Sequence, residues 1–325
     1  MIRPGRAQFD SQFEFLIKKI KPFLTNPSVI EIMVNPGGAV WIDELGKDMA
    51  NTGIVMAPNE VEGIINLVAS WAGTTVGKEK PILSSELPEG ERFEGLIPPV
   101  VETPSFSIRK HASMIFTLED YVSKGILLPD HKDFFIEAVK ERQNILAVGG
   151  TGSGKTTLLN AFVHAISKET PDHRVITIED TRELQVSSPN VVSLRTSDII
   201  DMTKLLKSCM RLRPDRILVG EVRDASALAL LKAWNTGHPG GLATVHANSA
   251  YGGLIRLEQL VQEAGIPQSA ARPIISEAVN VLVYIARTKE GRKISSIMKV
   301  EGLKNGEYVV KTIYGDPPRG SDVIG

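Results

Sequence analysis

Glycines, a lysine and hydroxyl side chains occupy residues 149–156 at the spacing of a phosphate-binding loop, Gly149-Gly150-Thr151-Gly152-Ser153-Gly154-Lys155-Thr156. Glycine permits backbone angles at which consecutive N–H groups point at one phosphate. A lysine here reaches the β- and γ-phosphates, and the hydroxyl after it can join a Mg²⁺ shell. A plain glycine-rich turn is the alternative, but chance rarely supplies the apolar run before it and the helical pattern after it as well. We therefore expect ATP and Mg²⁺, bound by Gly150, Thr151, Gly152, Ser153, Gly154, Lys155, Thr156 and Thr157, with the Thr156 hydroxyl on the metal.

Carboxylates follow two further apolar runs. Glu179 and Asp180 follow Ile178 at the end of the first run, which lies in the predicted strand 174–179. Glu221 comes directly after the second run, Ile217-Leu218-Val219-Gly220. Acidic residues at such positions orient water or hold Mg²⁺ near the γ-phosphate. A turn cap is the alternative for Glu179 and Asp180, because Asp and Thr are common where strands end. Gly220 stands where many phosphate-loop enzymes place a metal-holding aspartate, so we expect Glu221 to act on the metal through water.

A histidine, His246, ends a third apolar run, Gly241–Val245. A lone histidine is most often structural, but one at the ligand edge of a sheet can reach the γ-phosphate. Both interpretations stay open.

Arginines are the last chemical signal, because a guanidinium can stabilise charge on a transferring phosphoryl group. Most surface arginines do no such thing. Arg213-Pro214-Asp215 is better interpreted as a helix end, since proline stops a helix. The other candidates are Arg195, Arg211, Arg216 and Arg223 near Glu221, and Arg92 and Arg109 in the first part of the chain.

Alternating helix and strand patterns must position these groups. From residue 132 the patterns predict helices over 133–142, 156–167, 201–212 and 225–235 and strands over 144–148, 174–179, 191–195, 217–220 and 241–247. Such alternation is typical of an α/β domain with a mainly parallel sheet and helices on both faces. Ligands of these sheets bind at the carboxyl ends of the strands.

The first part of the chain has a different pattern. An amphipathic helix from Phe13 to Leu24, a hairpin over 29–45, a helix over 59–72 and short strands over 81–110 indicate a smaller α+β domain. The amphipathic helix could lie on a membrane surface, but packing on its own sheet is the commoner use of one apolar stripe. We expect an N-terminal domain over 1–110, a linker over 111–130 and a phosphate-loop domain over 131–325.

Composition excludes several classes of protein. The 325 residues are 42% hydrophobic and 23% charged, with a net charge of −1 and one cysteine. This balance gives no general basic surface for nucleic acid, and one cysteine cannot build a multi-cysteine zinc site. No apolar run approaches the roughly 20 residues that cross a bilayer. We expect a cytoplasmic protein that can dock on a membrane-bound partner.

The phosphate loop, Ile178-Glu179-Asp180, Val219-Gly220-Glu221 and Thr244-Val245-His246-Ala247-Asn248, in this order, resemble the secretion-motor ATPases of type II and type IV secretion, pilus dynamics and conjugal transfer. Those proteins share a Walker A loop, an aspartate box, an atypical Walker B strand and a histidine box. The likeness extends to Glu31–Asn35, Arg92 and Arg109, and the missing four-cysteine element favours the type IV secretion and conjugal-transfer branch.

The resemblance implies a RecA-like phosphate-loop domain after a PAS-like domain, assembled as a hexameric ring. By this resemblance Glu179 is the carboxylate of the aspartate box, Glu221 that of the Walker B strand, and His246 the histidine of the histidine box. By the same resemblance Lys155 belongs to the catalytic groups, and Arg92 and Arg109 lie near the phosphates. The function implied is an ATP-hydrolysing motor of a membrane-embedded secretion or conjugation apparatus, located in the cytoplasm or peripherally at the inner membrane. The alternatives are a nucleic-acid-stimulated motor of the same fold, against which the charge balance argues, and a nucleotide-gated assembly subunit with little turnover.

Overall fold

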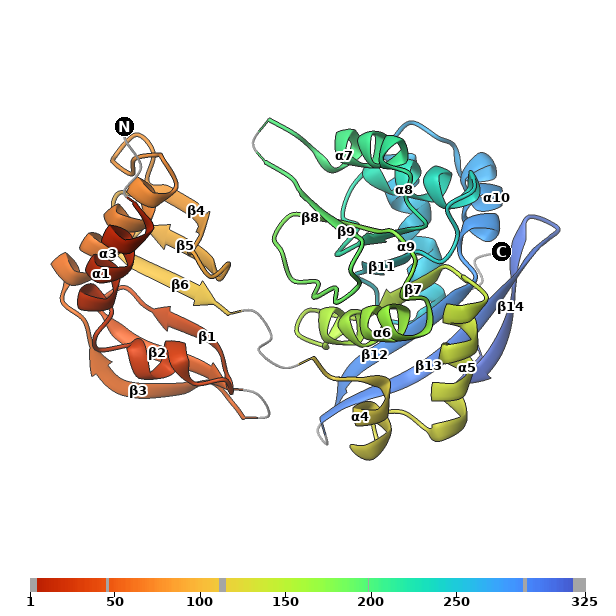
Figure 1. The fold of residues 1–325 in the computed structure, drawn as a ribbon, viewed down its shortest axis with the longest axis horizontal. Helices are drawn as coiled ribbons and strands as arrows, with labels where there is room; N and C mark the ends of the chain where they lie inside the picture. The colour runs from red at the N-terminus through yellow and green to blue at the C-terminus, as the bar shows by residue number, and fades with distance from the viewer. Residues whose placement is uncertain (1–4, 45–46, 111–114, 198, 289–290, 318–325) are drawn as a thin grey trace. The chain divides into compact units, whose positions relative to one another are not determined.

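The computed structural model describes residues 5–44, 47–110, 115–197, 199–288 and 291–317. The chain divides into two compact units, Met1–Met114 and Ile115–Gly325, each with its own sheet and hydrophobic core (Figure 1).

The first unit is an antiparallel sheet with helices packed on one face. Its six strands lie in the order β3-β2-β1-β6-β5-β4. Alternate strand residues such as Ile32 and Ile108 point into a core that also contains Ile64 of the third helix. The elements are α1 (Arg6–Leu16), α2 (Lys21–Thr25), β1 (Val29–Val34), β2 (Ala39–Glu44), β3 (Ala50–Val55), α3 (Pro58–Trp71), β4 (Ile82–Glu86), β5 (Arg92–Leu96) and β6 (Ser105–Arg109).

The apolar stripe near the N-terminus belongs to this core. Phe13, Ile17 and Ile20 are buried with the sheet residues, whereas Phe15 is 80% exposed. The stripe spans two short helices in place of the one that the pattern predicted. Packing on its own domain therefore accounts for it. Strand β3 was not predicted, because its residues Asn51 and Gly53 are poor strand formers.

The second unit has an eight-stranded sheet in the order β14-β13-β12-β7-β11-β10-β8-β9. Every pairing from β12 to β9 in that order is parallel, and the pairings of β13 with β12 and with β14 are antiparallel. The elements are α4 (Leu118–Ser123), α5 (Pro129–Lys140), β7 (Ile145–Val148), α6 (Lys155–Glu169), β8 (Val175–Glu179), β9 (Val191–Arg195), α7 (Met202–Cys209), the 3₁₀ turn Met210–Leu212, β10 (Arg216–Val219), α8 (Ser226–Asn235), β11 (Leu242–Val245), α9 (Ala250–Gln262), α10 (Gln268–Ala278), β12 (Val281–Thr288), β13 (Gly291–Lys304) and β14 (Glu307–Tyr314).

Both faces of this sheet are covered. Leu146 and Val148 of β7 pack into a core formed with α7, α8, α9 and α10. Ile145 and Ala147 of the same strand pack on the other side with α4, α5 and α6. Because side chains alternate across a strand, one short apolar run serves two cores.

The structure departs from the sequence predictions at two places. The expected linker 111–130 lies outside the described residues at 111–114. From Ile115 it belongs to the second unit, because Leu118, Tyr121 and Leu127 are buried in the core around α6. The elements after residue 247 were not predicted. Adjacent glycines interrupt the α9 pattern, and Gly253 is required there because a Cβ would lie 2.6 Å from Val148 Cγ2.

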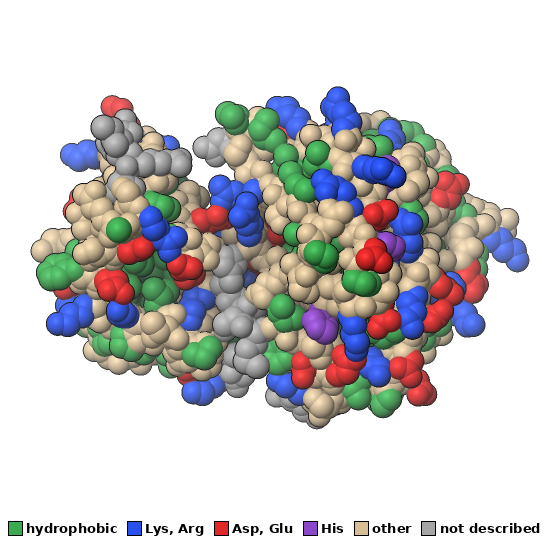
Figure 2. Space-filling view, viewed as in Figure 1, with side chains coloured by type: hydrophobic (Ala, Val, Ile, Leu, Met, Phe, Trp, Pro, Cys, Tyr) green, Lys and Arg blue, Asp and Glu red, His purple; other side chains and the backbone are tan. Residues whose placement is uncertain are grey.

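No helix among the described residues is long and apolar enough to cross a membrane. On the face drawn in Figure 2, acidic and basic side chains alternate over both units, in agreement with the net charge of −1.

Candidate functional site

Four neighbouring strands of the second unit deliver polar groups to one edge of the sheet. Strands β7, β11, β10 and β8 are parallel neighbours, so their carboxyl ends lie side by side. The glycine-rich loop follows β7, His246 follows β11, Glu221 comes two residues after β10, and Glu179 ends β8. The carboxyl edge of a parallel sheet is where such folds bind ligands.

The glycine-rich loop bends tightly between β7 and α6. Gly152 and Gly154 have φ of 68° and 98°, values that favour glycine. Helix α6 begins at Lys155, whose side chain is buried and whose Nζ donates to the Gly150 carbonyl at 2.9 Å. The N–H groups of the first helical turn and the ammonium therefore lie at the same end of α6, which suits an anion.

The loop fits phosphate by a second criterion. The Ser153 hydroxyl is buried and has no hydrogen-bond partner among the described residues. Nothing lies within 4 Å of a Cβ added at Gly150, so a ligand could approach the backbone there. An unsatisfied buried hydroxyl beside open backbone is a polar group that a bound phosphate oxygen could satisfy.

His246 contacts both the loop lysine and a carboxylate. Lys155 Nζ lies 3.3 Å from His246 Nδ1, and His246 Nε2 lies 2.6 Å from Glu221 Oε1. Burial and the neighbouring Lys155 charge lower the pKa of His246, although Glu221 opposes the shift. Lys155 Nζ also lies 3.4 Å from Nε2, and a neutral ring fits this position because one of its nitrogens can accept from the ammonium.

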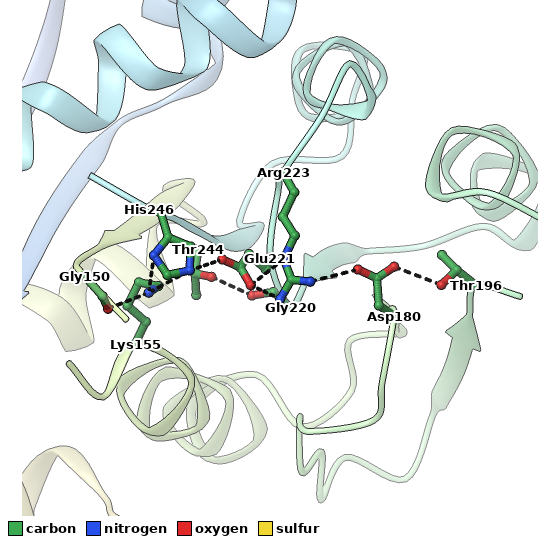
Figure 3. Close-up of polar contacts among 9 residues, drawn as sticks. All are labelled: Gly150, Lys155, Asp180, Thr196, Gly220, Glu221, Arg223, Thr244 and His246. Carbon is green, nitrogen blue, oxygen red and sulfur yellow. Dashed lines mark hydrogen bonds and ion pairs between the residues drawn. The ribbon is translucent and has the colours of Figure 1, made fainter. Parts of the chain in front are cut away.

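The polar contacts continue from Glu221 across the sheet edge, as Figure 3 shows. Arg223 Nε donates to Glu221 Oε2 at 2.8 Å, and Arg223 Nη1 lies 3.7 Å from Asp180 Oδ2. The Thr196 hydroxyl, just after β9, donates to Asp180 Oδ1 at 2.8 Å. We call this series, from Lys155 through His246, Glu221, Arg223 and Asp180 to Thr196, the polar chain.

Thr244 fixes the backbone beside the polar chain. Its hydroxyl donates to the Gly220 carbonyl at 2.8 Å, and its own carbonyl accepts from Val222 N at 2.9 Å. Sequence reasoning singled out neither Thr244 nor Thr196 for these roles. A polar residue at or after a strand end was the available signal.

Glu179 is buried and only 3% exposed. One carboxylate oxygen, Oε1, accepts from the backbone N–H groups of Glu183 and Leu184, both at 2.9 Å. Burial raises the pKa of Glu179 to about 7, although these two hydrogen bonds oppose the shift. The carboxyl group thus caps its own loop, as the alternative interpretation had it, and titrates where a general base is useful.

Divalent metal would have few protein ligands. The described residues contain no cluster of three or more His, Cys, Asp or Glu side chains that could hold an ion. Arg223 donates to Glu221 Oε2, and His246 Nε2 lies 2.6 Å from Glu221 Oε1, which has no hydrogen-bond partner among the described residues. Thr156 lies in the first turn of α6, directly after Lys155, so Mg²⁺ would depend largely on hydroxyl oxygen, water and the phosphates.

Four of the other arginines considered in the sequence lie outside the polar chain. Arg216 is buried away from the strand ends considered above and donates to His173 Nδ1 and to the Gly240 and Val139 carbonyls. Arg213 ends the helical segment with φ of 56°, which confirms the predicted helix end. Arg92 and Arg109 are direct cross-strand partners on β5 and β6 of the first unit. Their approach to the phosphates stays a prediction.

Comparison with known proteins matches both units together. The model of the family described as "Type II/IV secretion system protein" covers residues 17–302. The "Probable conjugal transfer protein TrbB" of Sinorhizobium fredii is 49% identical over 290 residues, which are 89% of this chain and 88% of that protein. The "Type IV secretion system protein VirB11" of Bartonella henselae is 32% identical, with 97% of both chains covered.

A solved structure shares the fold. The Yersinia pseudotuberculosis ATPase DotB superposes with a TM-score of 0.61 over 91% of this chain and 80% of that one, at 22% identity. The conjugal-transfer and VirB11 relatives agree with the branch that the motifs favoured. With a family model spanning most of its length and relatives matched nearly end to end, this chain belongs to the type II/IV secretion system protein family.

Proposed function

We propose that this protein is an ATPase motor that powers a conjugal-transfer or type IV secretion apparatus. The observation that carries the proposal is the contact of Lys155 with His246 and of His246 with Glu221, which joins the phosphate loop to two neighbouring strand ends. A loop that binds phosphate and groups that respond to the γ-phosphate are what hydrolysis needs. The relatives named for conjugal transfer and type IV secretion support the process served.

Each residue of the site has a distinct role in this mechanism. Lys155 and the loop amides of 150–154 bind the phosphates, and the Thr156 and Thr157 hydroxyls lie at the start of α6 beside them. Thr156 would hold Mg²⁺, which would neutralise part of the phosphate charge. Glu179 and Glu221 position the attacking water, and Glu221 would also act on the metal through a second water molecule. His246, held between Lys155 and Glu221, senses the γ-phosphate because the arriving anion competes for Lys155.

Further parts of the proposal rest on the family. The second unit is a RecA-like domain and the first a PAS-like domain, and the chain works as a homo-oligomer, a hexameric ring. Arg92 and Arg109 approach the phosphates and couple nucleotide state to the first unit. The ring works in the cytoplasm or docks peripherally at the inner membrane on proteins of the secretion machinery.

ATP hydrolysis by the purified protein tests the proposal. We expect Lys155→Ala to lower steady-state turnover about a hundredfold or more, the usual cost of removing a group that stabilises a phosphoryl transition state. Lys207→Ala, an exposed lysine on α7, is the matched control and should leave turnover unchanged. Circular dichroism and thermal melting establish that both variants are folded. Normal turnover in Lys155→Ala would reject the site.

Two experimental outcomes would favour a different function for this protein. Tight ATP binding without steady-state hydrolysis by the wild-type protein would indicate a nucleotide-gated assembly subunit. Stimulation of hydrolysis by single-stranded DNA, lost steeply as salt rises, would indicate a nucleic-acid motor.

A further inference from the structure

An arginine from the C-terminal hairpin packs against the phosphate loop. A Cβ added at Gly154 would lie 2.9 Å from Arg292 Cδ and 3.3 Å from Arg292 Nε. Ile285 Cδ1 would lie 3.6 Å from the same Cβ, so β12 and β13 meet one side of Gly154 together. Strand β12 is the parallel neighbour of β7, so its carboxyl end lies at the same edge as the loop.

The Arg292 guanidinium has no carboxylate partner among the described residues, although its charge opposes the rise that burial causes in the pKa of Tyr121. Arg292 Nε is buried without a hydrogen-bond partner in the part of the chain that the structure describes. Arg287 is its direct cross-strand partner, which places two cations opposite each other. A buried unsatisfied N–H and a like-charge pair both disfavour folding, so folding alone gives no reason for arginine here.

We propose that Arg292 is a positioning residue for nucleotide phosphate, whose charge acts through the phosphate loop from the side of Gly154. The inference rests on the proposed function, because it requires that the loop bind a nucleotide. A positive charge held beside a partly buried loop raises the potential at the anion site without touching the reacting atoms. Gly154 is then needed for two reasons, its φ of 98° and the space that Arg292 occupies.

The charge can be removed while the packing is kept. Arg292→Met retains an unbranched apolar stem against Gly154, and Arg292→Lys retains a charge. Arg287→Met is the control, because it removes the same charge from the exposed partner on the same hairpin. Dissociation constants are measured for fluorescent ATP, ADP and AMP analogues, and thermal melting is measured for each protein.

An electrostatic role predicts a graded effect. We expect Arg292→Met to weaken ATP binding about tenfold, which corresponds to about 1.4 kcal/mol, and to weaken ADP binding less and AMP binding least. Arg292→Lys should recover part of the loss, and Arg287→Met should have little effect. The melting temperature of Arg292→Met should stay the same or rise, because the unsatisfied N–H is gone.

Three results would overturn the inference: unchanged ATP affinity in Arg292→Met, equal weakening for all three nucleotides, or equal losses in Arg287→Met and Arg292→Met. The first excludes any role in binding, the second indicates a structural role, and the third indicates general surface charge. If the wild-type protein binds none of the analogues, the proposed function itself fails.

Discussion

The side chain of Glu179 lies against Gly220. A Cβ added at Gly220 would be 3.1 Å from Glu179 Cγ and 3.2 Å from Glu179 Oε1. The residue before Glu221 is therefore a glycine where many phosphate-loop enzymes have an aspartate, because the buried carboxyl group of Glu179 takes that space.

Gly220→Ala should therefore displace Glu179. We expect turnover to fall about tenfold, since small displacements of a catalytic group carry costs of this order, with ATP affinity little changed. Gly77→Ala is a matched control, because nothing lies within 4 Å of a Cβ at Gly77. Steady-state kinetics of both variants check this, and unchanged turnover in Gly220→Ala would show that the exact place of Glu179 does not matter.

The raised pKa of Glu179 predicts a pH dependence of activity. Burial raises this pKa to about 7, so the fraction of ionised carboxylate falls as the pH drops through that value. If ionised Glu179 accepts a proton from water, kcat/KM should decrease on the acid side of about pH 7. Glu179→Gln should lower kcat/KM and remove this limb. A wild-type profile that stays flat between about pH 6 and about pH 8 would exclude Glu179 as the base.

Glu221→Gln should bind ATP and hydrolyse it slowly. Glutamine keeps the size of the side chain beside His246, so the loop side of the site is kept, but the negative charge is lost. We expect turnover to fall about a hundredfold while the dissociation constant for ATP stays within about threefold of wild type. Undiminished turnover would move the catalytic role to Glu179 alone.

Arg223 should matter more for turnover than for stability. Its side chain is 53% exposed, and exposed ion pairs contribute about 0.2–1 kcal/mol to stability. It nevertheless holds Glu221 and links it to Asp180. We expect Arg223→Ala to lower kcat several-fold with little change in KM, and Arg223→Lys to recover part of it. Lys204→Ala, which removes an exposed ion pair to Asp201, is the control. Equal kcat in Arg223→Ala and wild type would contradict the role.

His173 should make the fold sensitive to acid. Burial and the adjacent Arg216 lower the pKa of His173, whose Nδ1 accepts from Arg216 Nε at 3.0 Å. A histidine with a lowered pKa in the folded state contributes stability above about pH 6.5 that is lost as the pH falls below it. Compared with wild type, His173→Gln should lose less unfolding free energy between about pH 7.5 and about pH 5.5. Chemical denaturation at the two pH values measures this, and equal losses would contradict it.

The sequence predicted the local parts of this molecule well. The glycine-rich loop, the acidic strand ends and His246 are each defined by neighbours within a few residues, and the alternation of helix and strand ordered them along one sheet. The apolar stripe at the N-terminus likewise indicated its own packing.

Contacts between distant residues could not be predicted in this way. His246 contacts Lys155, which is 91 residues away in the sequence. Arg292 packs on Gly154 from a hairpin that the sequence pattern did not predict. Such pairs depend on strand order, which a single sequence does not contain. The same holds for the approach of His246 to Glu221, because the two residues follow different strands.

Strand β7, which leads into the phosphate loop, is hydrogen-bonded to parallel strands on both sides. Its backbone consequently has little freedom to shift when a ligand arrives. Conformational changes caused by nucleotide binding or hydrolysis therefore begin with rotations of side chains and rearrangement of the connecting loops, while β7 keeps its position. Amide hydrogen exchange should therefore remain slow in β7 throughout the working cycle, and faster or altered exchange should be confined to the segments after β8, β10 and β11.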